Sequence, residues 1–254
     1  NVKDAIEMQN ECERYNSRLF VVKQNRFNLP VQKLHEAKEN GRFKKLFLGT
    51  VRVRWTREQS YYEQENWRGR WSMDGGVLAN QAIHHIDMLQ WLMGEVESVF
   101  GYAIQASAKI EAEDTAIATL KFKDGSLGLV EATTATRPRD LEGSISILGT
   151  GGTVVIEGFA VNQMKTWEFT DEHPEDKNVI NNFSVNPPNV YGYGHKEFYE
   201  SVVKSIIENT DHPLTSFEAI KSLKVVNAIY ESIHTGKEVN LNKSDFNNRL
   251  GSKD

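Results

Sequence analysis

Three polar side chains lie on one side of a helix-length segment near the middle of the chain. Between the glycine pair at 75–76 and Gly94 there is no further Gly or Pro, and each helical residue advances about 100°. Asn80, His84 and Asp87 therefore fall into one narrow stripe. Because imidazole exchanges protons near neutral pH, we predict a catalytic site with His84 as general acid–base beside Asn80 and Asp87. The alternative is that His84 is a hydrogen-bonded residue of the core.

The opposite side of this predicted helix is apolar, which indicates that it is buried there. The apolar positions are Leu78, Ala82, Ile86, Leu89 and Met93. His85 points to this side, and we predict a structural role for it. His84 and His85 diverge by about 100°, and the helix has no i, i+4 His pair and no Cys partner. We therefore predict no metal site.

Arginine and aromatic side chains alternate between residues 52 and 70, before this helix. Such a set can hold an anionic, ring-bearing ligand through bidentate contacts and stacking. We take Arg54, Trp67 and Arg68 as candidate substrate contacts. The alternative is a solvated surface from which the arginines extend into water.

Two other stretches carry candidate ligand contacts. Gln24 and Arg26 follow a predicted strand, and α/β proteins bind ligands at the carboxyl ends of strands. Tyr193 and His195 lie in a glycine-rich stretch before a predicted helix. We predict that Arg26, Tyr193 and His195 contact substrate; for the last two, the alternative is a simple approach to the helix.

The composition excludes several classes of function. The 254 residues carry a net charge of −5, whereas a nucleic-acid surface needs an excess of Lys and Arg. No apolar run approaches the roughly 20 residues that span a membrane, and no signal peptide opens the chain. The single cysteine, Cys12, has no disulfide partner, so we predict a cytoplasmic protein.

The first 25 residues differ in pattern from the rest of the chain. Residues 2–15 have the periodicity of an amphipathic helix, and residues 18–23 (RLFVVK) are typical of a buried strand. A helix followed by a strand is what the last unit of an α/β domain contributes. Residues 29–39 predict a second helix, with Pro30 in its first turn.

The remainder predicts an α+β fold. Strand patterns with short turns and no helices between them indicate a large open, mainly antiparallel sheet, and we expect helices on one of its faces. The predicted strands span residues 46–55, 96–106, 114–123, 126–136, 143–149, 153–157 and 162–170; a polar loop spans 171–189 and helices span 195–207 and 216–233.

The glycine-rich segment at 149–152 has the composition of a phosphate-binding loop. A dinucleotide fingerprint must lead from a strand into a helix, so that the helix N-terminus meets the pyrophosphate. The following residues, 153–157, predict a strand instead. We therefore predict a hairpin turn.

Taken together, these motifs resemble the Gfo/Idh/MocA oxidoreductase family over nearly the whole chain. The matching features are Gly75-Gly76, Asn80, His84, Asp87, the Trp91-Leu92-x-Gly94 ending, Gln24-x-Arg26, Glu113-Asp114, Asp124-Gly125, Leu148-Gly149-Thr150-x-Gly152 and Thr235-Gly236-Lys237. A narrower likeness, to the subgroup acting on UDP-N-acetyl-hexosaminuronates, rests on Trp67-Arg68-Gly69, Asn80-Gln81 and Tyr191-Gly192-x-Gly194-His195.

The resemblance implies hydride transfer between a sugar carbon and NAD or NADP. Residues 1–25 would be the end of a Rossmann domain, and 26–254 the substrate-binding and oligomerisation domain. His84 would exchange the hydroxyl proton, and Gln24 would contact the cofactor. The family's catalytic Lys, in an E-K-P motif, would lie upstream of Asn1. Asn80 replaces an Asp of many members, and an amide can position groups but cannot take a proton.

Alternatives remain for the ligand and for the chain itself. The substrate could be a UDP-sugar or other sugar nucleotide, or it could be inositol or another free monosaccharide. As an isolated polypeptide, the chain could also be a non-catalytic, self-associating binding domain. We expect a homodimer or homotetramer formed through the open face of the sheet, because an uncovered apolar sheet face favours pairing.

Overall fold

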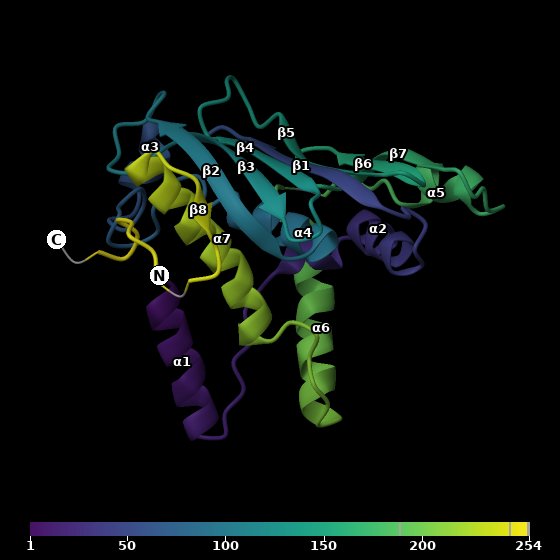
Figure 1. Cartoon of the computed structure of the whole chain (residues 1–254), viewed down its shortest axis with the longest axis horizontal. Helices are drawn as coiled ribbons and strands as arrows, with labels where there is room; N and C mark the ends of the chain where they lie inside the picture. Colours follow the sequence, from purple (N-terminus) through teal and green to yellow (C-terminus); the bar gives the residue numbers. More distant parts are fainter. Residues whose placement is uncertain (188, 244, 253–254) are drawn as a thin grey trace.

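The computed structural model describes residues 1–187, 189–243 and 245–252, which fold around one eight-stranded sheet (Figure 1). Its strands are β1 (Leu46–Arg54), β2 (Val96–Ile104), β3 (Thr115–Phe122), β4 (Leu127–Thr133), β5 (Glu142–Gly149), β6 (Gly152–Glu157), β7 (Gln163–Phe169) and β8 (Val239–Asn240). Their order is β7-β6-β5-β1-β4-β3-β2-β8. Only the β1–β4 pairing among these strands is parallel. The predicted α+β fold with a mainly antiparallel sheet is confirmed.

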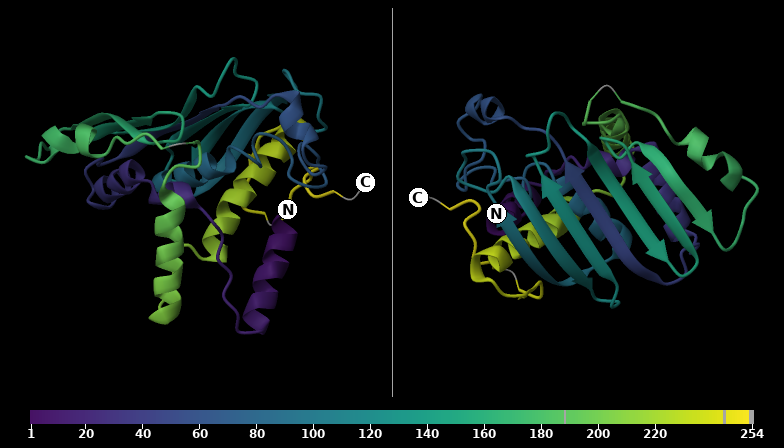
Figure 2. Two further views of the ribbon diagram at one scale, coloured as in Figure 1. Left: turned by 180° about the vertical axis from the view of Figure 1, so that it is seen from behind. Right: turned by 90° about the horizontal axis from the view of Figure 1, so that it is seen from above.

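The helices are concentrated on one side of this sheet (Figures 1 and 2). They are α1 (Val2–Arg14), the 3₁₀ helix η1 (Gln24–Phe27), α2 (Leu29–Glu39), α3 (Gln59–Glu63), α4 (Ile83–Met93), α5 (Asp176–Asn182), α6 (Gly194–Ile207) and α7 (Ser216–Thr235). Helix α4 packs against β1 and β5, and α7 against β2 and α4. Gly236, in the left-handed conformation, ends α7, as C-terminal glycines commonly do.

Strand β1 shows how the sheet divides its two faces. Val51 and Val53 are each 1% exposed and belong to the core, whereas Arg52 and Arg54 alternate with them on the other face. Gly49 allows α4 to approach closely, because a Cβ atom there would lie 2.6 Å from Cδ1 of Leu89. The alternation of valine and arginine along β1 therefore places the valines in the core and the arginines on the opposite, charged face.

No helix of the described residues covers the opposite face, which Figure 2 shows from above. Apolar side chains nevertheless lie there on three adjacent strands. Tyr102 on β2, Ile117 on β3 and Leu127 on β4 are 63%, 49% and 54% exposed. This face combines exposed apolar side chains with a group of paired charges.

Three local predictions were wrong. Residues 18–23 are extended but form no sheet strand; Phe20 makes a single bridge to Thr215. Helix α4 begins only at Ile83, since residues 77–82 form turns before it. The predicted loop at 171–189 contains α5, and its Pro188 lies outside the described residues.

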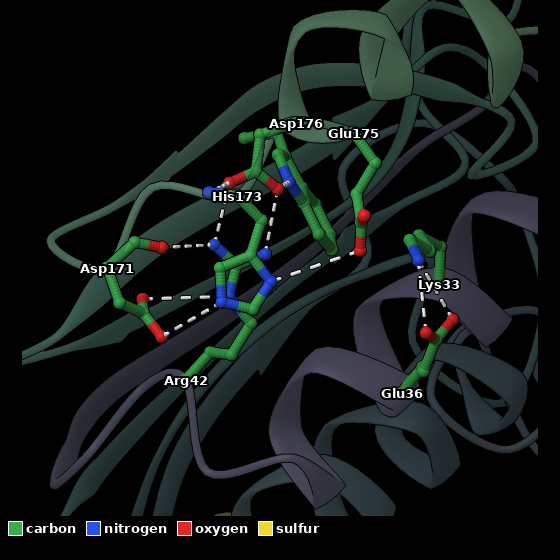
Figure 3. A network of polar contacts seen from close by, with 8 residues as sticks. Lys33, Glu36, Arg42, Asp171, His173, Glu175 and Asp176 are labelled. Atoms are coloured by element: carbon green, nitrogen blue, oxygen red, sulfur yellow. Dashed lines mark hydrogen bonds and ion pairs between the residues drawn. The ribbon is translucent and has the colours of Figure 1, made fainter.

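A polar cluster attaches α5 to the body of the domain (Figure 3). Arg42, just after α2, binds both carboxylate oxygens of Asp176 at 2.8 and 2.7 Å and also the carbonyl of Asp171. The indole of Trp167 on β7 donates to Asp176 as well. The Arg42 hydrogen bonds hold the pKa of Asp176 well below its usual range. These contacts hold the β6–β7 edge of the sheet, which is far in sequence from Asn80, His84 and Asp87.

Candidate functional site

Buried charges gather where η1 meets α4. The guanidinium of Arg26 binds Asp87 through two hydrogen bonds, of 2.6 Å from Nε and 2.9 Å from Nη2. Lys23 Nζ lies 3.9 Å from Asp87 Oδ1 and donates to Ser222 Oγ on α7 at 3.0 Å. Lys23, Arg26, Asp87 and Ser222 are all nearly inaccessible to solvent. One buried carboxylate therefore faces two cations, which joins the residues before α2 to both α4 and α7.

His84 lies beside this charge cluster with a half-buried ring. Its Nδ1 atom is shielded from solvent and has no hydrogen-bond partner among the described residues. Its pKa is lowered to about 4, mainly by burial and also by Lys23 and His195, against the opposing effect of Asp87. The imidazole is therefore uncharged at neutral pH and retains an acceptor for a proton.

The adjacent His85 has a different environment. It is 1% exposed and meets the Trp55 ring edge-on at 5.6 Å. Burial lowers its pKa to about 3. Its position agrees with the predicted structural role, because the ring is enclosed by the core.

The structure brings five of the predicted site residues together, namely Gln24, Arg26, His84, Asp87 and His195. Gln24 is 4% exposed, and its Oε1 has no partner among the described residues. His195, in the first turn of α6, is close enough to influence the pKa of His84. Gly194 permits α6 to approach η1, since a Cβ atom there would lie 2.0 Å from the carbonyl oxygen of Gln24.

The contacts of two of these residues differ from the predicted ones. Both oxygens of Asp87 bind Arg26, and Asp87 makes no hydrogen bond to His84, so the carboxylate does not hold the imidazole tautomer. Arg26 is committed to Asp87 and lies 4.9 Å over the Trp91 ring. Arg26 is therefore almost completely buried, with its guanidinium between Asp87 and the Trp91 ring.

Asn80 lies in the turn just before α4. Its Nδ2 donates to Asp74 Oδ2 at 2.6 Å, and burial raises the pKa of that carboxyl. No hydrogen bond joins Asn80 to His84 among the described residues. The amide therefore stabilises the loop that leads into the helix.

Four predicted substrate contacts interact with residues outside the His84 cluster. Arg54 is on the open face, where it binds Glu131 and Glu142. Trp67 and Arg68 lie on the loop after α3, and Arg68 lines an open cavity of about 840 Å³ at the end of the sheet. Tyr193 lines a separate cavity of about 340 Å³ and donates to the Asn186 carbonyl. The alternation of arginine and aromatic residues in the sequence did not show that these side chains have surroundings different from those of His84.

Sequence reasoning missed a buried support beneath the glycine pair. Glu113 Oε1 accepts from the Leu78 amide at 3.0 Å and from the Tyr230 hydroxyl at 2.9 Å. The same hydroxyl accepts from the Gly76 amide. A Cβ on Gly76 would lie 2.1 Å from the Glu113 carbonyl oxygen, so only glycine fits. Burial raises the pKa of Glu113 to about 7.

Lys23 was also missed, although the sequence holds a signal for it. It follows four apolar residues in the segment 19–23, and a lysine at the end of a buried run needs a partner. Asp87 is one such partner, but it lies 64 residues away in the chain and comes close to Lys23 only after folding. Pattern reasoning within one segment cannot reveal this.

The site holds two buried polar atoms without a hydrogen-bond partner among the described residues, Gln24 Oε1 and His84 Nδ1. The turn at 149–152 joins β5 to β6 and leads into a strand, so it lacks the helix N-terminus that a pyrophosphate loop needs. The described residues contain no group of three or more His, Cys, Asp or Glu side chains arranged to hold a metal ion. No described helix has the length and apolarity needed to cross a membrane.

Comparisons with known proteins agree with this arrangement. Residues 36–241 match the Gfo/Idh/MocA family model described as "Oxidoreductase family, C-terminal alpha/beta domain". A myo-inositol 2-dehydrogenase of Thermotoga maritima is 31% identical over 139 residues, which are 52% of this chain and 39% of that protein. The chain thus matches about two fifths of the length of this curated relative.

Solved structures show closer similarity. The WlbA dehydrogenase from Bordetella pertussis, in complex with NADH and UDP-GlcNAcA, matches with a TM-score of 0.90 and 41% identity, over 94% of this chain and 69% of that one. The WlbA dehydrogenase from Chromobacterium violaceum, in complex with the same two molecules, matches with a TM-score of 0.88 and 39% identity, over 94% and 67% of the two chains. A levoglucosan dehydrogenase at 19% identity and a TM-score of 0.78, over 95% and 71%, shares the fold.

Proposed function

The chain belongs to the Gfo/Idh/MocA oxidoreductase family, and we propose that it forms the substrate-binding part of an NAD(P)-dependent dehydrogenase that acts on a sugar or sugar nucleotide. The observation that carries this proposal is the His84 imidazole, which is half-buried, uncharged at neutral pH and makes no hydrogen bond through Nδ1 to any described residue. A partly exposed, uncharged imidazole beside charged groups is suited to proton exchange. In contrast, His85 is enclosed in the core.

The residues of this chain handle the proton in the proposed reaction. NAD(P), when bound, supplies a hydride acceptor. His84 takes the proton of the sugar hydroxyl as the carbon loses its hydride, and returns it in the reverse direction. The buried Arg26–Asp87 pair holds η1, which contains Gln24, against α4. Gln24 is the residue of this chain that we assign to the cofactor.

For the substrate, we propose a UDP-N-acetyl-hexosaminuronate. The support is the match to two WlbA dehydrogenases solved with NADH and UDP-GlcNAcA, at 41% and 39% identity. Inositol remains the second candidate because of the 31% identity to a myo-inositol dehydrogenase. Thermal unfolding with UDP-GlcNAcA or with myo-inositol, each with and without NAD⁺, separates the two, since a ligand of the folded state raises the midpoint. Stabilisation by inositol alone would exclude the nucleotide sugar.

We further propose that residues 1–25 form the end of a dinucleotide-binding Rossmann domain. An apolar groove of about 260 Å³ supports this; it lies between α1, residues 19–23 and the start of α7. Met8, one of its lining residues, is 58% exposed. We infer a cytoplasmic location from the single unpaired cysteine.

The decisive experiment replaces His84 by Gln in a protein that joins this chain to its dinucleotide-binding domain. We expect kcat to fall by roughly 10²–10⁴-fold, the usual contribution of a general acid–base, with little change in substrate binding. His85→Gln is the control at the neighbouring position, and the property measured for it is whether it still folds. Near-normal turnover of His84→Gln would remove the imidazole from the mechanism.

For assembly, we propose a homodimer or homotetramer through the open face of the sheet. The support is the exposed apolar set of Tyr102, Ile117 and Leu127 on adjacent strands, since such patches commonly mark interfaces. Ile117→Asp should lower the mass measured by sedimentation equilibrium. An unchanged mass would place the interface elsewhere.

A further inference from the structure

The cavity of about 340 Å³ that Tyr193 lines has no part in the proton exchange proposed above. Three aromatic side chains contribute to its walls: Phe27 at the end of η1, Phe183 just after α5 and Tyr193 just before α6. Small-molecule sites have volumes in this range and are mostly apolar, with a few precisely placed polar groups. The cavity therefore has the size and the lining of a site for a flat ring.

Hydrogen bonds hold one wall of this cavity in place. Asn162, just before β7, donates from Nδ2 to the Val185 carbonyl at 2.7 Å and to Asn186 Oδ1 at 3.0 Å. The Val185 amide donates back to the Asn162 carbonyl at 3.1 Å. The Tyr193 hydroxyl donates to the Asn186 carbonyl at 3.2 Å. The wall is thus joined both to the sheet and to the start of α6, so the cavity is formed before any ligand binds.

Asn28 supplies a hydrogen-bond acceptor in the opposite wall. It is 5% exposed, and its Nδ2 donates to the Ala160 carbonyl at 3.1 Å. Because a carbonyl only accepts, the amide nitrogen must face Ala160, and this fixes the position of Oδ1. Oδ1 lies beside Gly192, another residue of the cavity wall, where an added Cβ would be 2.9 Å away. None of the described residues donates to Oδ1, which leaves it able to accept from a ligand.

The cavity shares η1 with the His84 cluster. Phe27 lines the cavity, whereas Arg26, the preceding residue, binds Asp87 on α4. Gln24, which we assign to the cofactor, lies three residues before Phe27, a rise of about 6 Å along a 3₁₀ helix. A nucleotide sugar has two phosphates and a ribose between its sugar and its base. Its two ends therefore need neighbouring but separate sites, as η1 provides.

We propose that this cavity binds the uracil base of the substrate, an inference that rests on the UDP-sugar proposed above. The ring stacks on Tyr193, whose side chain is 54% exposed, and the N3–H group donates to Asn28 Oδ1. Proteins commonly recognise unpaired bases in this way, by stacking on aromatic side chains and by hydrogen bonds to the base edge. N3 of cytosine has no hydrogen, so an acceptor at this position favours uracil.

The first test compares two bases on the same diphosphate. Isothermal titration calorimetry measures the binding of UDP and CDP to the protein that includes the dinucleotide-binding domain. We expect CDP to bind about 10- to 100-fold more weakly, because its N3 leaves Asn28 Oδ1 without a hydrogen. Equal affinities, tighter binding of CDP, or no binding of UDP each overturn the inference.

Two variants test the walls of the cavity separately. Tyr193→Ala should weaken UDP binding by about tenfold through loss of stacking. Tyr199→Ala is the matched control, since Tyr199 is 56% exposed on α6 and does not line the cavity; its affinity for UDP should equal that of the wild type. Asn28→Leu should abolish the preference for UDP over CDP, a readout that a general loss of folded protein would not change. An Asn28→Leu protein that keeps the preference, or equal losses in the two tyrosine variants, overturns the inference.

Kinetics separate this inference from the proposed function. Tyr193→Ala should raise KM for UDP-GlcNAcA by about tenfold and leave kcat nearly unchanged, because the base does not contact the reacting carbon. An unchanged KM overturns the uracil site, whereas the role of His84 is tested independently by His84→Gln. Turnover of myo-inositol with none of UDP-GlcNAcA would instead overturn the proposed substrate, so the two failures are distinguishable.

Discussion

The two faces of the sheet each carry a cluster of arginine or lysine with carboxylates, but their burial differs. On the helix-covered side, the Asp87 and Arg26 side chains are 1% and 8% exposed. On the open face, Arg54 and Glu131 are 35% and 30% exposed and are joined by hydrogen bonds of 2.6 and 2.9 Å. The bonds have nearly the same lengths in both places. What differs is the solvent around them.

The two clusters also differ in charge balance. The open face pairs two arginines, Arg52 and Arg54, with two carboxylates, Glu131 and Glu142. The buried cluster sets Lys23 and Arg26 against Asp87 alone. A balanced, hydrated network has little influence on its surroundings, whereas an unbalanced one in a low dielectric does. The pKa of His84, beside the buried cluster, is lowered to about 4 mainly by burial, with a smaller contribution from Lys23.

The largest expected effect is the loss of the buried carboxylate. Asp87→Asn leaves Lys23 and Arg26 facing each other without a counter-charge. Breaking a buried ion pair by removing one partner costs about 3–5 kcal/mol of unfolding free energy. Urea denaturation followed by circular dichroism measures this. A loss below about 1 kcal/mol, the level of a surface pair, would show that water reaches the cluster.

A further carboxylate extends the comparison, because Glu113 is buried with no ion pair to any described cation. Its pKa is raised from 4.5 to about 7, so its protonated form contributes stability that is present below pH 4.5 and is lost as the pH rises through 7. Since one pH unit corresponds to about 1.4 kcal/mol, the total loss is about 3 kcal/mol.

The test is the unfolding free energy of wild type and Glu113→Gln between pH 4 and pH 8. The amide can still accept from the Leu78 amide and the Tyr230 hydroxyl. The difference between the two proteins should shift in favour of the variant by about 3 kcal/mol over this range. The buried histidines are common to both proteins, so their contribution cancels. A difference independent of pH would contradict the raised pKa.

The sequence predicted the fold well because the fold depends on local periodicity. The alternation of Val51 and Val53 with Arg52 and Arg54 predicted both faces of β1 before its neighbours were known. The same reasoning was wrong for residues 18–23, where an apolar run predicted a strand. A strand also needs hydrogen-bonding neighbours, and here the segment makes a single bridge, from Phe20.

The candidate site was predicted in part, for the same physical reason. The helical stripe correctly grouped His84 with Asp87, because one helix determines both positions. It did not reveal that Asp87 binds Arg26, or that Ser222 on α7 holds Lys23, since these contacts join segments far apart in the chain. Arg54 was grouped with the substrate contacts by composition, although alternation along β1 places it on the opposite face from the core.

The smallest expected effect belongs to the open face and completes the comparison. Glu131→Gln removes one of two carboxylates that pair with Arg54, and Glu142 remains 3.0 Å from it. We expect a loss of about 0–1 kcal/mol in urea denaturation at low protein concentration and moderate salt. If this face pairs two subunits as proposed, the pair becomes buried on assembly, and the loss should grow with protein concentration. A loss at low concentration equal to that of Asp87→Asn would mean that burial does not separate the two clusters.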